Sequence, residues 1–96
     1  MKLIHYEDLW EKAEQYHKEN SSSNETIDDI IYELTLKIGL YKAIIQKSEI
    51  SEADKKEAKS RLFGEILLTT TKLSLKENIN VYEVLQNVLM ENLNSI

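Results

Sequence analysis

Acidic and basic side chains recur at helical spacing in two largely apolar segments. In "DDIIYELTLK", Asp29 and Glu33 are four residues apart, and Lys37 follows after four more. In "SRLFGEILLTTTK", Arg61 and Glu65 have the same spacing. Residues at i and i+4 lie on one face of a helix. Carboxylates on two packed helices could therefore converge, and carboxylate oxygens are ligands that Mg²⁺ shares with substrate phosphates.

Two interpretations of these charges stay open. In the first, Glu33–Lys37 and Arg61–Glu65 are ordinary ion pairs on helix surfaces, each worth about 0.2–0.5 kcal/mol. In the second, Asp29, Glu33 and Glu65 hold a metal ion. Lys37 and Arg61 could instead bind a phosphate directly, because both side chains can contact anions.

The composition predicts one all-α domain over residues 1–96. Proline is absent and the only glycines are Gly39 and Gly64, so the tight turns of a sandwich or barrel are missing. The lack of cysteine excludes disulfides, thiol catalysis and zinc-thiolate sites. A formal net charge of −5 argues against binding to nucleic acid or to an anionic membrane.

The sequence also predicts a cytoplasmic protein. No apolar run approaches the roughly 20 residues that a membrane span needs. The start "MKLIHYEDLW" carries Glu7 and Asp8, so it does not resemble a signal peptide.

Apolar residues at three- and four-residue spacing predict four helices. They cover residues 3–19, about 25–47, from a Ser51 cap to about 76, and 81 to about 94. We expect Asn24 or Ser23 to cap the start of the second helix, and Ser51 with Asp54 to cap the start of the third. Asn78 in the left-handed conformation should end the third helix, and Asn80 with Glu83 should cap the start of the fourth. Short links favour antiparallel neighbours and thus a four-helix bundle.

The second and third helices carry more apolar surface than one seam requires. The main stripe of the second helix consists of Ile27, Ile30, Ile31, Leu34, Ile38, Tyr41 and Ile45. Further apolar residues lie outside the main stripes, namely Leu36, Leu40, Ile44, Leu68 and Leu75. Large extra apolar patches usually mark a partner surface. We therefore predict that a homodimer or higher homo-oligomer completes the bundle, with a heterologous partner as the alternative.

The segment "FGEILLTTTKLSLKENINVYEVLQNVLMEN" resembles the second half of the MazG-like nucleotide pyrophosphohydrolases, in the all-α NTP pyrophosphatase superfamily. Gly64-Glu65 stands where the family has Gly-Asp, and Asn78-Ile79-Asn80 replaces a Gly-Ile-Asp turn. Asn92 matches an asparagine of the family's Lys-Asn pair, whereas Glu91 replaces the lysine. The resemblance is detailed over residues 61–93 and extends in helix pattern to nearly the whole chain.

The resemblance implies a four-helix MazG-like fold that uses Mg²⁺ to split nucleoside triphosphates into a monophosphate and pyrophosphate. The family signature is E-x-x-E on one helix and E-x-x-D on the next. Glu33 and Glu65 match two of these four acids, but Ile30, Leu36 and Leu62 replace acids at the signature spacings. Asp29 could supply a third ligand.

With these acids missing, we expect a nucleotide-related protein whose magnesium-dependent hydrolysis is weak or lost. The alternative is a non-enzymatic oligomeric or regulatory protein built on the same scaffold. Asn92, Lys37 and Arg61 are the predicted ligand-binding residues.

Other polar and aromatic residues fit structural roles better. His5 and His17 are too far in sequence from the acids to define a metal site, and His17 suits the negative end of its helix. Trp10 and Tyr16 suit a core or an interface. Thr69 lies near Glu65 on the helical wheel, but threonines in helices often bond to their own backbone.

Overall fold

The computed structural model describes residues 6–20 and 24–94, and all regular structure in these ranges is helical. The elements are α1 (Tyr6–Asn20), α2 (Ile27–Gln46), α3 (Glu52–Lys76) and α4 (Val81–Asn94). The prediction of an all-α chain with four helices is therefore confirmed. None of the described helices combines the length and apolar character needed to cross a membrane. His5 and Ser23 lie outside the described residues.

The start of α2 differs from the prediction, because Thr26 rather than Asn24 caps the helix. The Thr26 hydroxyl accepts a hydrogen bond from the Asp29 amide at 3.1 Å, and the Asp29 carboxylate accepts one from the Thr26 amide at 2.9 Å. This reciprocal capping box satisfies two backbone donors at the helix start. It also gives the Asp29 side chain a local structural role.

The other end signals act as the sequence predicts. The Ser51 hydroxyl accepts from the Asp54 amide at 3.1 Å, and the Asn80 side chain accepts from the Glu83 amide at 3.1 Å. Asn78 has a φ of 58°, the left-handed conformation that commonly follows a helix end.

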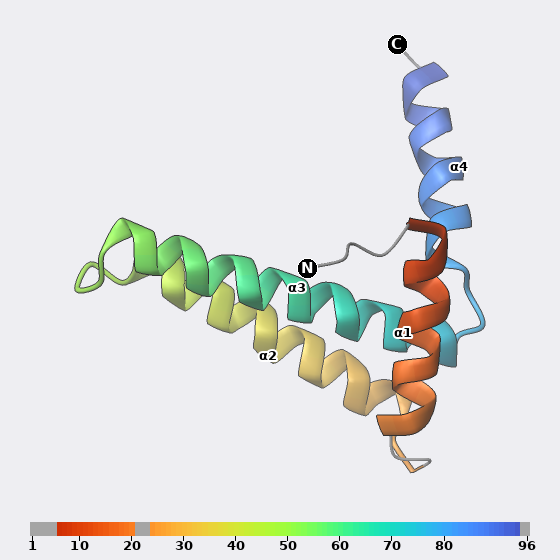
Figure 1. Cartoon of the computed structure of the whole chain (residues 1–96), viewed down its shortest axis with the longest axis horizontal. Helices are drawn as coiled ribbons and strands as arrows, with labels where there is room; N and C mark the ends of the chain where they lie inside the picture. The colour runs from red at the N-terminus through yellow and green to blue at the C-terminus, as the bar shows by residue number, and fades with distance from the viewer. Residues whose placement is uncertain (1–5, 21–23, 95–96) are drawn as a thin grey trace.

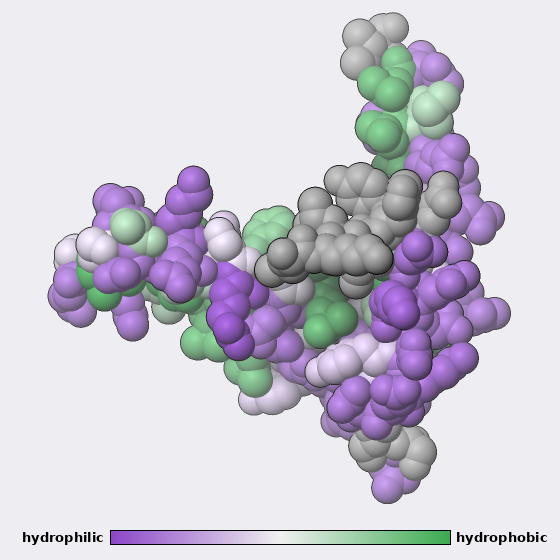
Figure 2. All heavy atoms as spheres, in the orientation of Figure 1, coloured by the Kyte–Doolittle hydropathy of each residue, from purple (hydrophilic) through white to green (hydrophobic). Residues whose placement is uncertain are grey.

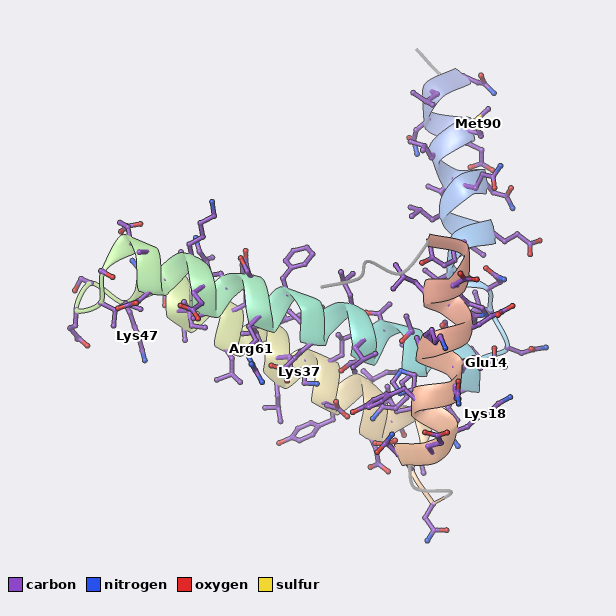
Figure 3. The ribbon with its side chains drawn as sticks, in the orientation of Figure 1. Glu14, Lys18, Lys37, Lys47, Arg61 and Met90 are labelled. Carbon is purple, nitrogen blue, oxygen red and sulfur yellow. The ribbon has the colours of Figure 1, made fainter. Side chains whose placement is uncertain are left out.

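The helices do not close into one bundle within a single chain. Figure 1 shows α2 and α3 as an antiparallel hairpin, α1 crossing one end of it, and α4 pointing away. Side chains project from α4 with no helix beside them along most of its length (Figure 3). The link after α3 turns the chain without folding α4 back, so the expected fourth position of the bundle is not filled from the same chain.

The chain is consequently extended for its size. Its radius of gyration is 15.9 Å, whereas about 12.5 Å is expected for a compact domain of this length. Among the described apolar side chains, Ile30 alone is fully buried, at the contact side of α2.

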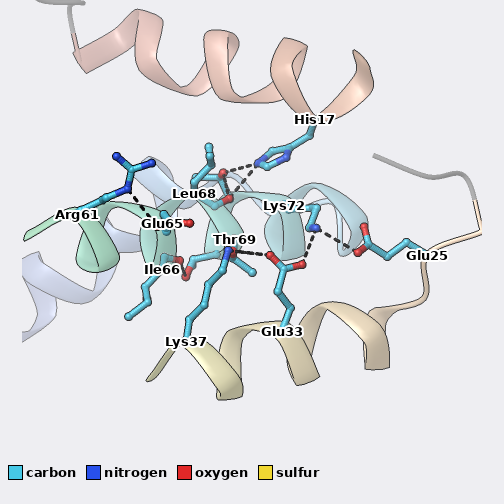
Figure 4. A network of polar contacts seen from close by, with 12 residues as sticks. His17, Glu25, Glu33, Lys37, Arg61, Glu65, Ile66, Leu68, Thr69 and Lys72 are labelled. Atoms are coloured by element: carbon cyan, nitrogen blue, oxygen red, sulfur yellow. Dashed lines mark hydrogen bonds and ion pairs between the residues drawn. The ribbon is translucent and has the colours of Figure 1, made fainter. Parts of the chain in front are cut away.

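The hairpin has two different faces. Its charged face carries Glu33 and Lys37 of α2 with Thr69 and Lys72 of α3, and α1 covers part of it (Figure 4). The opposite side, which we call the apolar face, consists of Ile27, Ile31, Ile38 and Ile45 of α2 with Phe63 and Leu67 of α3, all at least 38% exposed.

Leu68 and Leu75 do not belong to an uncovered patch, contrary to the sequence prediction. The Leu68 carbonyl contacts His17 of α1 at 2.9 Å, and Leu75 lines a groove together with Trp10 of α1. The α1 helix therefore covers this side of α3. Leu36 and Leu40 of α2 are exposed, as an uncovered patch requires.

Candidate functional site

A polar pocket of about 160 Å³ lies where α1, α2 and α3 meet (Figure 4). Its lining residues are Tyr16, His17 and Asn20 of α1, Glu33 and Lys37 of α2, and Glu65, Leu68, Thr69 and Lys72 of α3. Because one side of each hairpin helix and the last turns of α1 converge there, the pocket joins residues that are far apart in the sequence.

Glu33 is the centre of the polar network. Its Oε2 accepts a hydrogen bond from Lys37 Nζ at 2.8 Å, and its Oε1 accepts one from Lys72 Nζ at 2.9 Å. The bond from Lys37 is the largest influence on this carboxyl, and together with Lys72 and Thr69 it overcomes partial burial and lowers the pKa of Glu33 from 4.5 to about 2. Glu33 is therefore a carboxylate at neutral pH, with a cation on each oxygen.

Lys72 connects Glu33 to a second acid. Its Nζ also lies 3.1 Å from the Glu25 carboxylate, in the link before α2. Burial alone would lower the pKa of Lys72, but its hydrogen bonds to Glu33 and Glu25 outweigh burial and raise it. The ammonium is thus charged at neutral pH and ties α3 to the link before α2 and to the middle of α2.

Thr69 is enclosed beneath this network, with only 2% of its surface exposed. Its hydroxyl donates to Glu33 Oε2 at 3.1 Å and accepts from Lys37 Nζ at 2.8 Å. The neighbouring Thr70 and Thr71 instead donate to carbonyls of their own helix, as helical threonines often do. Thr69 therefore belongs to the site, and the alternative of a bond to its own backbone is wrong.

His17 fastens α1 to α3. Its Nε2 lies 2.9 Å from both the Leu68 carbonyl and the Thr71 hydroxyl, and the residue is 7% exposed. Thr71 already donates to the Leu68 carbonyl at 2.6 Å, so Nε2–H is the donor that satisfies both oxygens. His17 was expected to serve its own helix end, and its contact with α3 corrects that expectation.

The structure brings two of the three predicted metal ligands to one pocket. Glu33 and Glu65 both line it, although Glu65 is half-exposed and lies 3.8 Å from Arg61. Asp29 is instead engaged in the capping box of α2. The Arg61 side chain is 86% exposed and extends from the hairpin (Figure 3).

Asn92, the remaining predicted ligand-binding residue, lies on α4 outside the pocket. Its side-chain amide donates to the Val88 carbonyl of the same helix at 2.9 Å. Of the predicted phosphate contacts, Lys37 is the one that lines the pocket.

The donors of the single chain do not fit Mg²⁺ as they are arranged. Within the described residues, no three acidic or histidine side chains are grouped to hold a metal ion. Mg²⁺ requires near-octahedral oxygen ligands, whereas both oxygens of Glu33 already face lysines. A magnesium site stays a prediction.

Comparison of the chain with protein-family models, curated proteins and solved structures found no match. The resemblance to MazG-like proteins therefore remains an interpretation of the motifs themselves.

Sequence reasoning missed the contributions of His17 and Glu25 to this site. The bonds of His17 to α3 span more than 50 residues, and that of Glu25 to Lys72 spans 47. The position of Lys72 could be predicted in part, because on a helical wheel it lies on the same side of its helix as Arg61 and Glu65. For His17 the only signal was its position on the apolar stripe of its helix.

Protonation of His17 is expected to weaken the attachment of α1. Burial is the main cause that lowers the pKa of His17 below 6.5, and the charge of Lys72 lowers it further. The Leu68 carbonyl and the carboxylates of Glu25 and Glu33 raise this pKa, but they do not outweigh burial. Since the folded state disfavours the proton, stability is full above pH 6.5 and falls as the pH drops from there through the folded pKa.

An NMR titration of the imidazole in a His5→Gln background checks this expectation, because His17 is then the only histidine. We expect a midpoint below 6.5 and, in His17→Gln, no stability change from this source as the pH falls below 6.5. A His17 midpoint at or above 6.5 would contradict the inferred burial.

Proposed function

We propose that this protein is a MazG-like, nucleotide-related protein of the all-α NTP pyrophosphatase fold, in which Mg²⁺-dependent pyrophosphohydrolysis is weak or lost. The observation that carries this proposal is the position of Glu33. It lines an interhelical pocket with Glu65, as a remnant of an acidic cage would, yet Lys37 and Lys72 occupy both of its oxygens.

The lysines change the chemistry that the pocket can perform. Metal-assisted phosphate hydrolysis requires an ion that activates water and neutralises developing charge. In this pocket the positive charges belong to Lys37 and Lys72, which are already paired with Glu33 and, for Lys72, also with Glu25. An ammonium group cannot activate a water as a metal ion does. A phosphate group would have to displace the Glu33 carboxylate in order to bind both lysines.

The size of the pocket limits what it could hold. Pockets that enclose small organic ligands usually measure about 300–1,000 Å³, against about 160 Å³ here. At most the phosphates of a nucleotide would therefore enter the pocket, displacing Glu33 from Lys37 and Lys72, while the sugar and base would lie outside it.

Pyrophosphate release from each nucleoside triphosphate, with Mg²⁺ or Mn²⁺, tests the proposal. We expect turnover far below the 1–10³ s⁻¹ typical of enzymes, together with a thermal shift on nucleotide binding. The shift should be lost in Lys37→Met, whereas Lys47→Met, at the far end of the hairpin (Figure 3), serves as a control. Rapid release would contradict the loss of hydrolysis.

A second candidate function is a non-enzymatic oligomeric or regulatory protein on the same scaffold. Its support is the exposed apolar surface of α4, where Val84, Leu85, Val88, Leu89 and Leu93 are 44–60% exposed. Absence of pyrophosphate release, combined with absence of any nucleotide-induced thermal shift, would select this function over the first.

A further inference from the structure

We propose that the groove between α1 and the turn from α3 to α4 binds an alkylguanidinium group, such as the side chain of arginine. Trp10 of α1 and Glu83 of α4 both line this cavity, which we call the tryptophan groove, and they are the residues that would hold the cation. The tryptophan groove shares no lining residue with the polar pocket. The inference is therefore independent of the proposed function.

The tryptophan groove has the size of a site for a small ligand. Its volume is about 500 Å³, against about 160 Å³ for the polar pocket, and pockets that enclose small organic ligands usually measure about 300–1,000 Å³. Three segments form its walls: one side of α1, the end of α3 with the link that follows, and the first turn of α4.

The wall on α1 combines an aromatic ring with charged groups. Trp10, Glu14 and Lys18 are four residues apart, so they lie on one side of the helix. Figure 3 shows Glu14 and Lys18 on the side of α1 next to the link between α3 and α4. Trp10 is half-buried, and within the described residues no ring or cation stacks on its indole. The face of an indole attracts cations more strongly than that of any other side chain.

The wall on α4 supplies an acid. The Glu83 amide donates to the Asn80 side chain at 3.1 Å, which holds its backbone in the helix cap. In the part of the chain that the structure describes, the Glu83 carboxylate has no ion pair and no hydrogen bond. The Glu14 carboxylate, by contrast, lies 3.0 Å from Lys18 Nζ. A cationic ligand would therefore meet an unpaired carboxylate at Glu83.

The turn between α3 and α4 gives the groove a fixed apolar wall. Asn78 has a φ of 58°, its amide donates to the Leu75 carbonyl at 3.1 Å, and the Ile79 amide donates to the Ser74 carbonyl at 2.7 Å. These paired bonds are those of a Schellman motif, which satisfies the last carbonyls of a helix. Because the turn is held in this way, Leu75 and Ile79 line the groove without any rearrangement on binding.

An alkylguanidinium group matches all three walls. Its planar cation stacks on aromatic rings and offers several donors to a carboxylate, as Trp10 and Glu83 require. Its apolar stem can lie against Leu75 and Ile79. An anion would meet the charges of Glu83 and Glu14, and an uncharged apolar ligand would bury a carboxylate without a partner. Figure 2 shows mainly hydrophilic residues over α1, so the rest of the ligand would stay in a polar surrounding.

The fluorescence of Trp10 tests the inference, because Trp10 is the only tryptophan of the chain. The probes are N-acetyl-arginine amide and N-acetyl-citrulline amide, which have nearly the same shape but differ in charge. We expect a saturable change with the arginine probe and binding at least about tenfold weaker with the citrulline probe, since hydrogen bonds between charged groups are the stronger ones. Equal binding of the two probes would overturn the proposal.

A substitution at Glu83 tests the site without depending on the choice of probe. Glu83→Gln should weaken binding of the arginine probe at least about tenfold, while glutamine at this position of a capping box still allows α4 to form. Glu91→Gln is the matched control, because it removes the same charge from α4 outside the groove. Unchanged binding in Glu83→Gln, or equal weakening in Glu91→Gln, would overturn the proposal.

Butylguanidine distinguishes the two sources of such a group. It carries the cation and an apolar stem but no peptide bonds. Tighter binding of N-acetyl-arginine amide would support an arginine of a peptide as the ligand, and tighter binding of butylguanidine would support a small guanidine. Absence of binding by both compounds in the unmodified chain, where no variant has to fold, would overturn the proposal.

Discussion

Replacing Ile30 by alanine is expected to lower the free energy of unfolding by about 3 kcal/mol, within the 2–5 kcal/mol typical of such truncations. Ile30 is 0% exposed and lies on the side of α2 that meets α3. Truncation loses its apolar burial and leaves a cavity. The melting temperature should fall by more than 10 °C, at roughly 4–8 °C per kcal/mol for a domain of this size. Circular dichroism at one fixed protein concentration measures the change, because oligomer stability depends on concentration.

Leu36→Ala is the control for Ile30→Ala on the same helix. Leu36 is 51% exposed, so its truncation should change the free energy of unfolding by no more than about 0.5 kcal/mol. If the two variants lose the same stability, the contact between α2 and α3 is not centred on Ile30.

The burial of Ile30 also bears on the missing acids of the MazG-like signature. Ile30 stands three residues before Glu33, where the resemblance implies a carboxylate. In this chain the position is enclosed, and an ionised acid there would be costly to bury without a partner. In this structure, position 30 is occupied by buried apolar packing of α2.

Much of the fold could be predicted because its signals are local. Helix periodicity and the caps at Ser51, Asn78 and Asn80 depend on residues a few positions apart. The start of α2 was misplaced because Asn24 precedes the true cap, Thr26, and both are good capping residues. The direction of α4 could not be predicted, since it depends on which tertiary contacts form after the turn.

In the candidate site, too, local contacts could be predicted from the sequence and long-range contacts could not. The pairs Glu33–Lys37 and Arg61–Glu65 are neighbours on one helix, so their spacing predicts them. The bonds of Lys72 to Glu33 join two helices, and the contact of His17 with α3 joins a third. Such partners require the helices to be placed in space, and sequence spacing alone does not supply that placement.

Replacing Glu33 by glutamine is expected to lower the free energy of unfolding by about 1–3 kcal/mol at pH 7. Glutamine keeps the shape of the side chain but removes the charge that faces Lys37 and Lys72. Those two lysine side chains are only 22% and 15% exposed. The change leaves two partly buried cations with Glu25 as the remaining acid of the network. Chemical denaturation at pH 7 measures the loss.

The pH dependence separates this charge effect from a loss of packing. The folded pKa of Glu33 is about 2, against 4.5 ordinarily, so its contribution is present above pH 4.5 and is lost as the pH falls through about 2. The difference in stability between wild type and Glu33→Gln should therefore shrink over this range, while a packing defect would persist.

Glu65→Gln is the matched control: Glu65 is 49% exposed and lies 3.8 Å from an 86% exposed Arg61, so its loss should cost less than about 0.5 kcal/mol. Equal losses from the two glutamine variants would contradict a special role for the paired lysines.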